Sequence, residues 1–425
     1  MSKQQRSYLG LRGGGLNLAQ LFLVVAPAFV LFGYNQACPG GLLSLEDWTH
    51  TFPQIATTGP NGSPGKSTLQ GFVVAIFALG ALFGALSCSW SADRLGRRKT
   101  IFLGAVLTLV GEILQCAAFS LAQFVVGRVV LGAGIGMLSA VVPVWQSECS
   151  PAKHRGKHVI LDGTFISAGF AITSWVNLGF FQIKTGSVPW RLPLAIPIAF
   201  SIVAMAAIFF LPESPRWLVR VNRVEEARRT LSALRDTDVD SSDVKREIDG
   251  IELSLEETSN NAASMRDIFT MGEDKLFFRF MLCIVLQFFQ QMSGGNLISV
   301  YSTVIFQENL QLSSQVARIL SGGALTWKLL CCAVAFFTVD RFGRRILIMV
   351  SGTGMALCML CLAVATSFPH DNKSASIASV FFIFLFNFFI VLGFLGANWL
   401  YATEVAPIRL RIAMASISTA NNWLW

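Results

Sequence analysis

The sequence predicts an all-α membrane protein built from two pseudo-symmetric helical bundles, and three observations lead to this prediction. The composition is 53% hydrophobic and only 14% charged, whereas soluble domains carry about 25% charged residues. Long apolar runs recur along the whole chain. A short charged connection between two such runs, Ser89–Lys99 (SWSADRLGRRK), is echoed in the second half as Val339–Arg345 (VDRFGRR).

A second pair of charges supports a duplication. Glu148 and Arg155 follow the first connection, and Glu404 and Arg411 follow the second at the same mutual spacing. The same signals in the same order in both halves are typical of membrane proteins built from parallel repeats.

A membrane-spanning helix needs about 20 apolar residues. Runs of this kind occupy roughly 16–36, 68–88, 100–119, 121–144, 158–181, 190–211, 275–303, 315–339, 346–367 and 377–402. An eleventh begins near residue 412, and the roughly 14 residues to Trp425 cover only about 21 Å. We therefore expect a sequence that stops inside a helix, with the second bundle incomplete. The expected parts are an N-terminus (1–15), a first bundle (16–211), a polar linker (212–274) and a second bundle (275–425).

Lys and Arg concentrate in alternate loops and at the N-terminus, which predicts a cytoplasmic N-terminus. The loop at 37–67 is then external, and so are the candidate glycosylation sequons at Asn61 and Asn372. The same topology accounts for the net charge of +8 without nucleic acid. The nine cysteines show no metal-binding spacing, so no metal or cofactor is expected.

The linker has two charged helical patterns, at 224–235 and about 244–257, separated by an acidic turn. Two interpretations remain open: a solvated connection between the bundles, or a small cytoplasmic helical lid.

Several motifs together resemble the sugar porter family of the major facilitator superfamily. The matching pieces are Asp93–Arg98, Gly127-Arg128, Pro143–Glu148 with Arg155, Pro212–Leu218, Gln290–Asn296, Asp340–Arg345, and Trp399 with Glu404 and Arg411. The PESPRWL motif followed by QQMSG is the most specific combination. The resemblance implies two six-helix bundles and transport of a small molecule by alternating access.

The amides of the seventh apolar run are the main candidate substrate contacts. Gln287 and Gln291 share one helix face, and amides suit a neutral polyhydroxylated ligand because they both donate and accept. The alternative is that they join helices. The family resemblance adds Gln290 and Asn296 as sugar contacts, Trp399 as an aromatic platform and Asn422 as a polar contact.

Charged residues at the predicted cytoplasmic surface form a candidate gate, because opposite charges there can bridge neighbouring helices. The alternative is that they only set topology. The set comprises Asp93, Arg97, Arg98, Glu148, Arg155, Glu213, Arg216, Asp340, Arg344, Arg345, Glu404 and Arg411.

Three intramembrane positions bear on coupling and substrate. Proton-coupled members of the family carry Asp where this chain has Asn35, beside an Arg matched by Arg128, so the sequence favours facilitated transport or coupling by another group. Lys328 is expected near mid-membrane and should face a cavity, meeting Asp162 or an anionic substrate such as a sugar acid. The alternative is a lysine at the edge of the protein whose side chain extends to the membrane surface. Glu112 is interpreted equally well as a packing or a coupling residue.

We therefore expect a non-enzymatic transporter of a monosaccharide or a related polyol or sugar acid, in the plasma membrane. The expected partners are the small-molecule substrate and the lipid bilayer. Two alternatives are a nutrient sensor on the transporter fold and a truncated, non-functional fragment.

Overall fold

The computed structural model describes residues 7–57, 63–150, 155–183, 186–260, 275–369, 372–395, 405 and 411–424. These residues are almost entirely helical, and the β-structure found among them is one isolated bridge between Tyr8 and Leu11. In this part of the chain, ten helices are long and apolar enough to span a membrane. They match the ten complete spans expected from the sequence.

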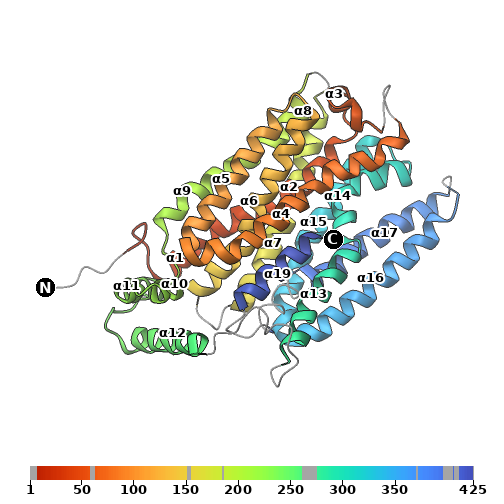
Figure 1. Ribbon diagram of the computed structural model, residues 1–425. Helices are drawn as coiled ribbons and strands as arrows, with labels where there is room; N and C mark the ends of the chain where they lie inside the picture. The colour runs from red at the N-terminus through yellow and green to blue at the C-terminus, as the bar shows by residue number, and fades with distance from the viewer. Residues whose placement is uncertain are drawn as a thin grey trace.

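The N-terminal half contains the first six of these helices (Figure 1). The first is continuous from Gly13 to Leu42, through α1, a short π-helical turn and α2. It is longer than the predicted 16–36, so the predicted external loop at 37–67 begins as helix and contains a further short helix, α3. The bounds are α1 Gly13–Gln20, η1 Leu21–Val25, α2 Ala26–Leu42, α3 Glu46–Thr51, α4 Ser67–Leu95, α5 Arg97–Cys116, α6 Leu121–Cys149, α7 Arg155–Phe181, α8 Val188–Ala195, α9 Pro197–Ala207 and η5 Ile208–Phe210.

Three short helices follow at one end of the molecule (Figure 1). They are α10 Pro215–Arg220, α11 Val224–Arg235 and α12 Ser242–Asn260. They share a small apolar core that includes Trp217, Leu231 and Ile248. The predicted helices at 224–235 and 244–257 are thus present, and they form a packed unit. We call this end of the molecule the α10–α12 face.

The described residues of the C-terminal half form four more spanning helices and the 14-residue helix α19. The bounds are α13 Leu276–Met292, α14 Gly295–Val304, η7 Ile305–Asn309, α15 Ser314–Phe342, α16 Arg344–Thr366, α17 Lys373–Ile390, η8 Val391–Leu395 and α19 Arg411–Leu424. The predicted span at 275–303 is present as Leu276–Gln307, and it is interrupted between α13 and α14, a break that the sequence did not predict. Gly294 breaks the helix, because its backbone φ of +79° is one that residues with a side chain rarely adopt.

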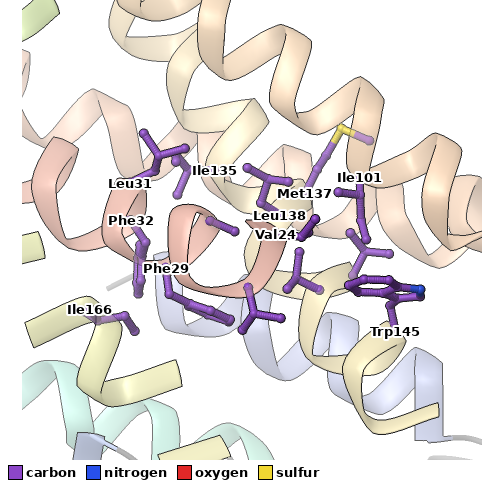
Figure 2. Close-up of a cluster of buried hydrophobic side chains, with 14 of the residues drawn as sticks. Val24, Phe29, Leu31, Phe32, Ile101, Ile135, Met137, Leu138, Trp145 and Ile166 are labelled. Atoms are coloured by element: carbon purple, nitrogen blue, oxygen red, sulfur yellow. The ribbon is translucent and has the colours of Figure 1, made fainter. Parts of the chain in front are cut away.

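The largest apolar core among the described residues lies mainly in the N-terminal half, and Leu325, Ala420 and Trp423 join it from the C-terminal half. Figure 2 shows part of it, where Leu31, Ile135 and Leu138 belong to a cluster of buried side chains from several helices. Small residues let these helices approach closely. A Cβ atom on Gly80 of α4 would lie 2.2 Å from the Val129 carbonyl of α6. Backbone contact this close is how helices gain packing energy in lipid, where the hydrophobic effect is weak.

Candidate functional site

The amides of the seventh spanning helix lie at the junction of α13, α14 and α19. Gln291 Nε2 donates a hydrogen bond to the backbone carbonyl of Asn422, and Asn296 Nδ2 donates to Gln291 Oε1. Gln287 is buried and Gln290 is half-buried. Asn422 Oδ1 is buried and accepts no hydrogen bond from the described residues. The structure thus assembles Gln291, Asn296 and Asn422, while Gln291 also makes the helix-joining contact considered as the alternative.

An aromatic cluster sets α19 against the N-terminal half. The ring of Trp423 lies edge-on to Phe32 of α2, with centroids 4.8 Å apart, and to Phe77 of α4, at 5.6 Å. Trp423 is 3% exposed. The sequence does not single out this residue, because one aromatic side chain among many in an apolar run carries no distinguishing signal. The amide group therefore lies where the two halves meet.

Lys328 of α15 is also at the interface between the halves. Its side chain is buried, and Nζ donates to Ser299 Oγ of α14 at 2.8 Å. The ammonium lies 4.7 Å from the ring centroid of Phe170, which belongs to α7 of the other half. The expected ion pair with Asp162 is absent from the described residues. Asp162 lies eight residues before Phe170, which is about 12 Å away along α7. Lys328 therefore contacts Ser299 and Phe170 and not Asp162.

A small polar cavity lies between the halves, beside Ser299. Its volume is about 10 Å³, room for about one water molecule. Its walls come from α2, α7, α14 and α15 and include Asn177, Ser299, Ser321 and Arg318. Arg318 of α15 donates to the Gly41 carbonyl at 2.6 Å and to Ser44 Oγ at 2.8 Å. This buried arginine, which the sequence analysis missed, therefore ties α15 to the segment that ends the first spanning helix.

Asn35 and Arg128 belong to a polar cluster inside the N-terminal half. Asn35 Nδ2 donates to Glu112 Oε1 at 3.0 Å, and the Ser201 hydroxyl donates to Glu112 Oε2 at 2.8 Å. Arg128 donates to the backbone carbonyls of Asn35, at 3.1 Å, and Val74, at 2.6 Å. Arg128 is thus held by carbonyl groups, and within the described residues neither Arg128 nor Glu112 has an ion-pair partner.

Three of the charged residues predicted to form a gate, Asp93, Arg97 and Glu148, lie together at the α10–α12 face. Arg97 binds Glu148 through two contacts, Nε to Oε2 at 2.9 Å and Nη2 to Oε1 at 3.1 Å. The two side chains are only 2% and 10% exposed. Asp93 forms ion pairs with Arg97 at 3.5 Å and with Arg220 at 2.6 Å. These pairs join α4, α5, α6 and α10, all on the N-terminal side of the protein.

Glu213 and Arg98 cap helix ends. The Glu213 carboxylate accepts hydrogen bonds from the backbone N–H groups of Arg97 and Arg98, which begin α5. Arg98 donates to the carbonyls of Ile208 and Phe209, at the end of the sixth spanning helix. Burial raises the pKa of the Glu213 carboxyl above its ordinary range, and backbone N–H groups offset part of that rise. The acid and the base therefore satisfy groups that helix ends leave unpaired.

The remaining gate residues are less informative. Arg216 donates to Ser254 Oγ at 3.0 Å and so joins α10 to α12. Arg344 is half-buried and Arg345 is exposed at the start of α16. The other predicted site residues lie outside the described residues, entirely or in their side chains; they are Arg155, Asp340, Trp399, Glu404 and Arg411.

An apolar groove lies elsewhere, between α15 and α17. Its volume is about 650 Å³, and it is lined almost wholly by apolar side chains such as Leu320, Trp327 and Phe381. Phe381 is 60% exposed, as expected for a side chain that meets lipid. This groove offers no hydrogen-bonding wall for a hydroxylated ligand, so the polar interface is the better candidate site.

Among the described residues, ten spanning helices in two halves, with polar groups gathered between them, define a multi-pass membrane protein. The fold matches that of the major facilitator superfamily proton:xylose symporter XylE bound to 6-bromo-6-deoxy-D-glucose. The TM-score is 0.82 at 23% identity, covering 96% of this chain and 86% of that chain.

The family described as "Sugar (and other) transporter" matches residues 21–425, and the chain belongs to it. The major facilitator superfamily transporter mfsA of Aspergillus fumigatus is 35% identical, over 98% of this chain and 77% of its own length. The sugar transporter STL1 of Saccharomyces cerevisiae is 32% identical, over 98% and 73%. The protein is therefore a transporter and not an enzyme.

Proposed function

We propose that this protein carries a small polyhydroxylated compound across a membrane by alternating access, the two halves rocking about a site between them. The substrate class is a monosaccharide or a related polyol or sugar acid. The observation that carries the proposal is the convergence of Gln291, Asn296 and Asn422 beside the interface that Trp423 makes with the other half. Relatives named as transporters of sugar and of glucose support the same substrate class.

The amide group suits this substrate chemically. Amides offer donors and acceptors at once, which matches adjacent sugar hydroxyls. The unpartnered Oδ1 of Asn422 is available to accept from such a hydroxyl. Gln287, Gln290 and Trp399 complete the proposed contacts. Lys328 would add a positive group, which favours a sugar acid over a neutral hexose.

The charge network would control access from the α10–α12 face. In this proposal that face is cytoplasmic and the membrane is the plasma membrane. Arg97, Glu148 and Asp93 hold the N-terminal helices together, so that they move as one body. Further predicted gate residues are proposed to complete this charge network; they are Arg155, Asp340, Glu404 and Arg411. Arg318 and its contacts to Gly41 and Ser44 would close the opposite side.

The test is uptake of labelled sugars, polyols and sugar acids by a transporter-deficient host that expresses the protein. Gln291→Ala should raise the KM about tenfold, because a lost hydrogen bond of about 1–1.5 kcal/mol corresponds to that factor. Gln182→Ala removes an amide at an exposed position and serves as the matched control. Uptake of no compound in the panel, with the protein present at the cell surface, would refute the proposal.

A further inference from the structure

Glu112 is a buried acid that the proposed transport function does not use. Its side chain is 1% exposed, and it lies within the fifth turn of a spanning helix, α5. Each carboxyl oxygen has one neutral donor, the Asn35 amide or the Ser201 hydroxyl. A lone ionised carboxylate is very costly in an apolar interior and binds a proton instead of remaining charged. Ionisable groups placed inside membranes commonly mark ion or proton pathways.

Among the described residues, the surroundings of Glu112 offer no charge that would fix it in the ionised state. Arg128 of α6 directs its guanidinium to the Asn35 and Val74 carbonyls, and Arg191 of α8 binds the Cys116 and Ala118 carbonyls beyond the end of α5. The titratable groups close enough to interact with the carboxyl are Tyr34 of α2 and Cys116 of its own helix. Neither is a cation, so the site can hold a neutral acid.

The two donors also suit both protonation states. The Ser201 hydroxyl can donate to a carboxylate or rotate to accept from a carboxylic acid, and an amide offers either a donor or an acceptor. A site of this kind can exchange a proton without leaving a polar group unsatisfied. Asp162, the other buried acid described in the spanning helices, has a carboxyl oxygen without a partner.

The position of Glu112 connects it to the movement of the two halves. Asn35 belongs to α2, and α2 contacts the C-terminal half on either side of Asn35, at Phe32 and at Gly40. Phe32 packs on Trp423, and the backbone at Gly40 is so close to the Val300 carbonyl that a Cβ there would lie 1.9 Å from it. Separation of the halves would therefore open the face of α2 to water and change access to Glu112.

We infer that Glu112 is the proton-binding site of this transporter, taking up one proton from one side of the membrane and releasing it on the other in each cycle. Asn35 is a positioning residue, whose amide holds the carboxyl against α2. The inference rests on the proposed transport function for its coupling role. Proton binding itself can be measured without a substrate, so the two proposals fail separately.

The first measurement is infrared difference spectroscopy of the purified protein between acid and alkaline pH. The wild type should show the carbonyl band of a buried carboxylic acid, and Glu112→Gln should lose it. Glu225→Gln removes an exposed acid and should keep the band. An unchanged band in Glu112→Gln, or its loss in Asp162→Asn alone, would overturn the assignment whether or not any substrate has been found.

The second measurement is uptake into vesicles with the membrane potential held at zero. With one proton carried per substrate, an inward gradient of one pH unit supports about tenfold accumulation. We expect that accumulation in the wild type and none in Glu112→Gln, while substrate exchange, which moves no net proton, continues. Wild-type uptake that equilibrates without accumulation, or a Glu112→Gln variant that still accumulates, would overturn the inference and leave sugar transport standing.

Discussion

The ion pair between Arg97 and Glu148 gives a quantitative prediction. The two residues share two contacts, at 2.9 and 3.1 Å, and the arginine is 2% exposed. Removing one member of a buried pair typically costs about 3–5 kcal/mol, because the other charge is left buried and unpaired. We expect Arg97→Ala to lower the free energy of unfolding by about 3 kcal/mol, the lower end, since Glu148 is 10% exposed.

A double-mutant cycle isolates the pair. Arg97→Ala, Glu148→Ala and the double variant would be unfolded by titration with a denaturing detergent and followed by tryptophan fluorescence. The coupling energy should be about 2–3 kcal/mol. Arg228 and Glu225, 3.5 Å apart on the surface of α11, provide the control and should couple by about 0.2–0.5 kcal/mol. Equal coupling energies for the two pairs would refute the argument from burial.

Three further predictions follow from close contacts. Gly80→Ala should destabilise the protein by about 1–3 kcal/mol in the same titration, because its Cβ would meet the Val129 carbonyl; Gly71→Ala, with open space around it, should be neutral or stabilising. Glu213→Ala should cost about 1–2 kcal/mol by uncapping α5, with partial recovery in Glu213→Gln; equal losses would contradict a capping role. Lys328→Met should lower uptake of a sugar acid about tenfold and leave a neutral sugar unaffected, as measured by competition between the two.

The spanning helices could be predicted from the sequence because their signal is local. Twenty apolar residues bounded by charges specify a helix in lipid whatever surrounds it. The break after α13 was missed, although Gly294 was visible, because a glycine within an apolar run only permits a positive φ. The length of the first helix was underestimated because Ala37–Leu42, with one proline and two glycines, resembles a loop and is helical only through its packing.

The site could be predicted only as a set of residue types. Gln291 and Asn296 were identified because polar amides are conspicuous among apolar neighbours. Their partners depend on how the helices are arranged, and no spacing in the chain indicates that Asn422 would lie beside them. Glu213 could likewise be predicted only as one of the charged gate residues. Its carboxylate caps α5, which lies more than a hundred residues away in sequence.

The N-terminal segment has a consequence for how the protein is made. Tyr8 binds Thr230 at 3.1 Å, and Arg12 binds the Ser232 and Thr237 carbonyls on and after α11, 220 and 225 positions further along the chain. Ribosomes add about 5–20 residues per second, so Tyr8 and Arg12 wait about 10–45 s after their own synthesis for these partners. These contacts form only after the six preceding spans have been synthesised, and they then hold the N-terminal segment against α11.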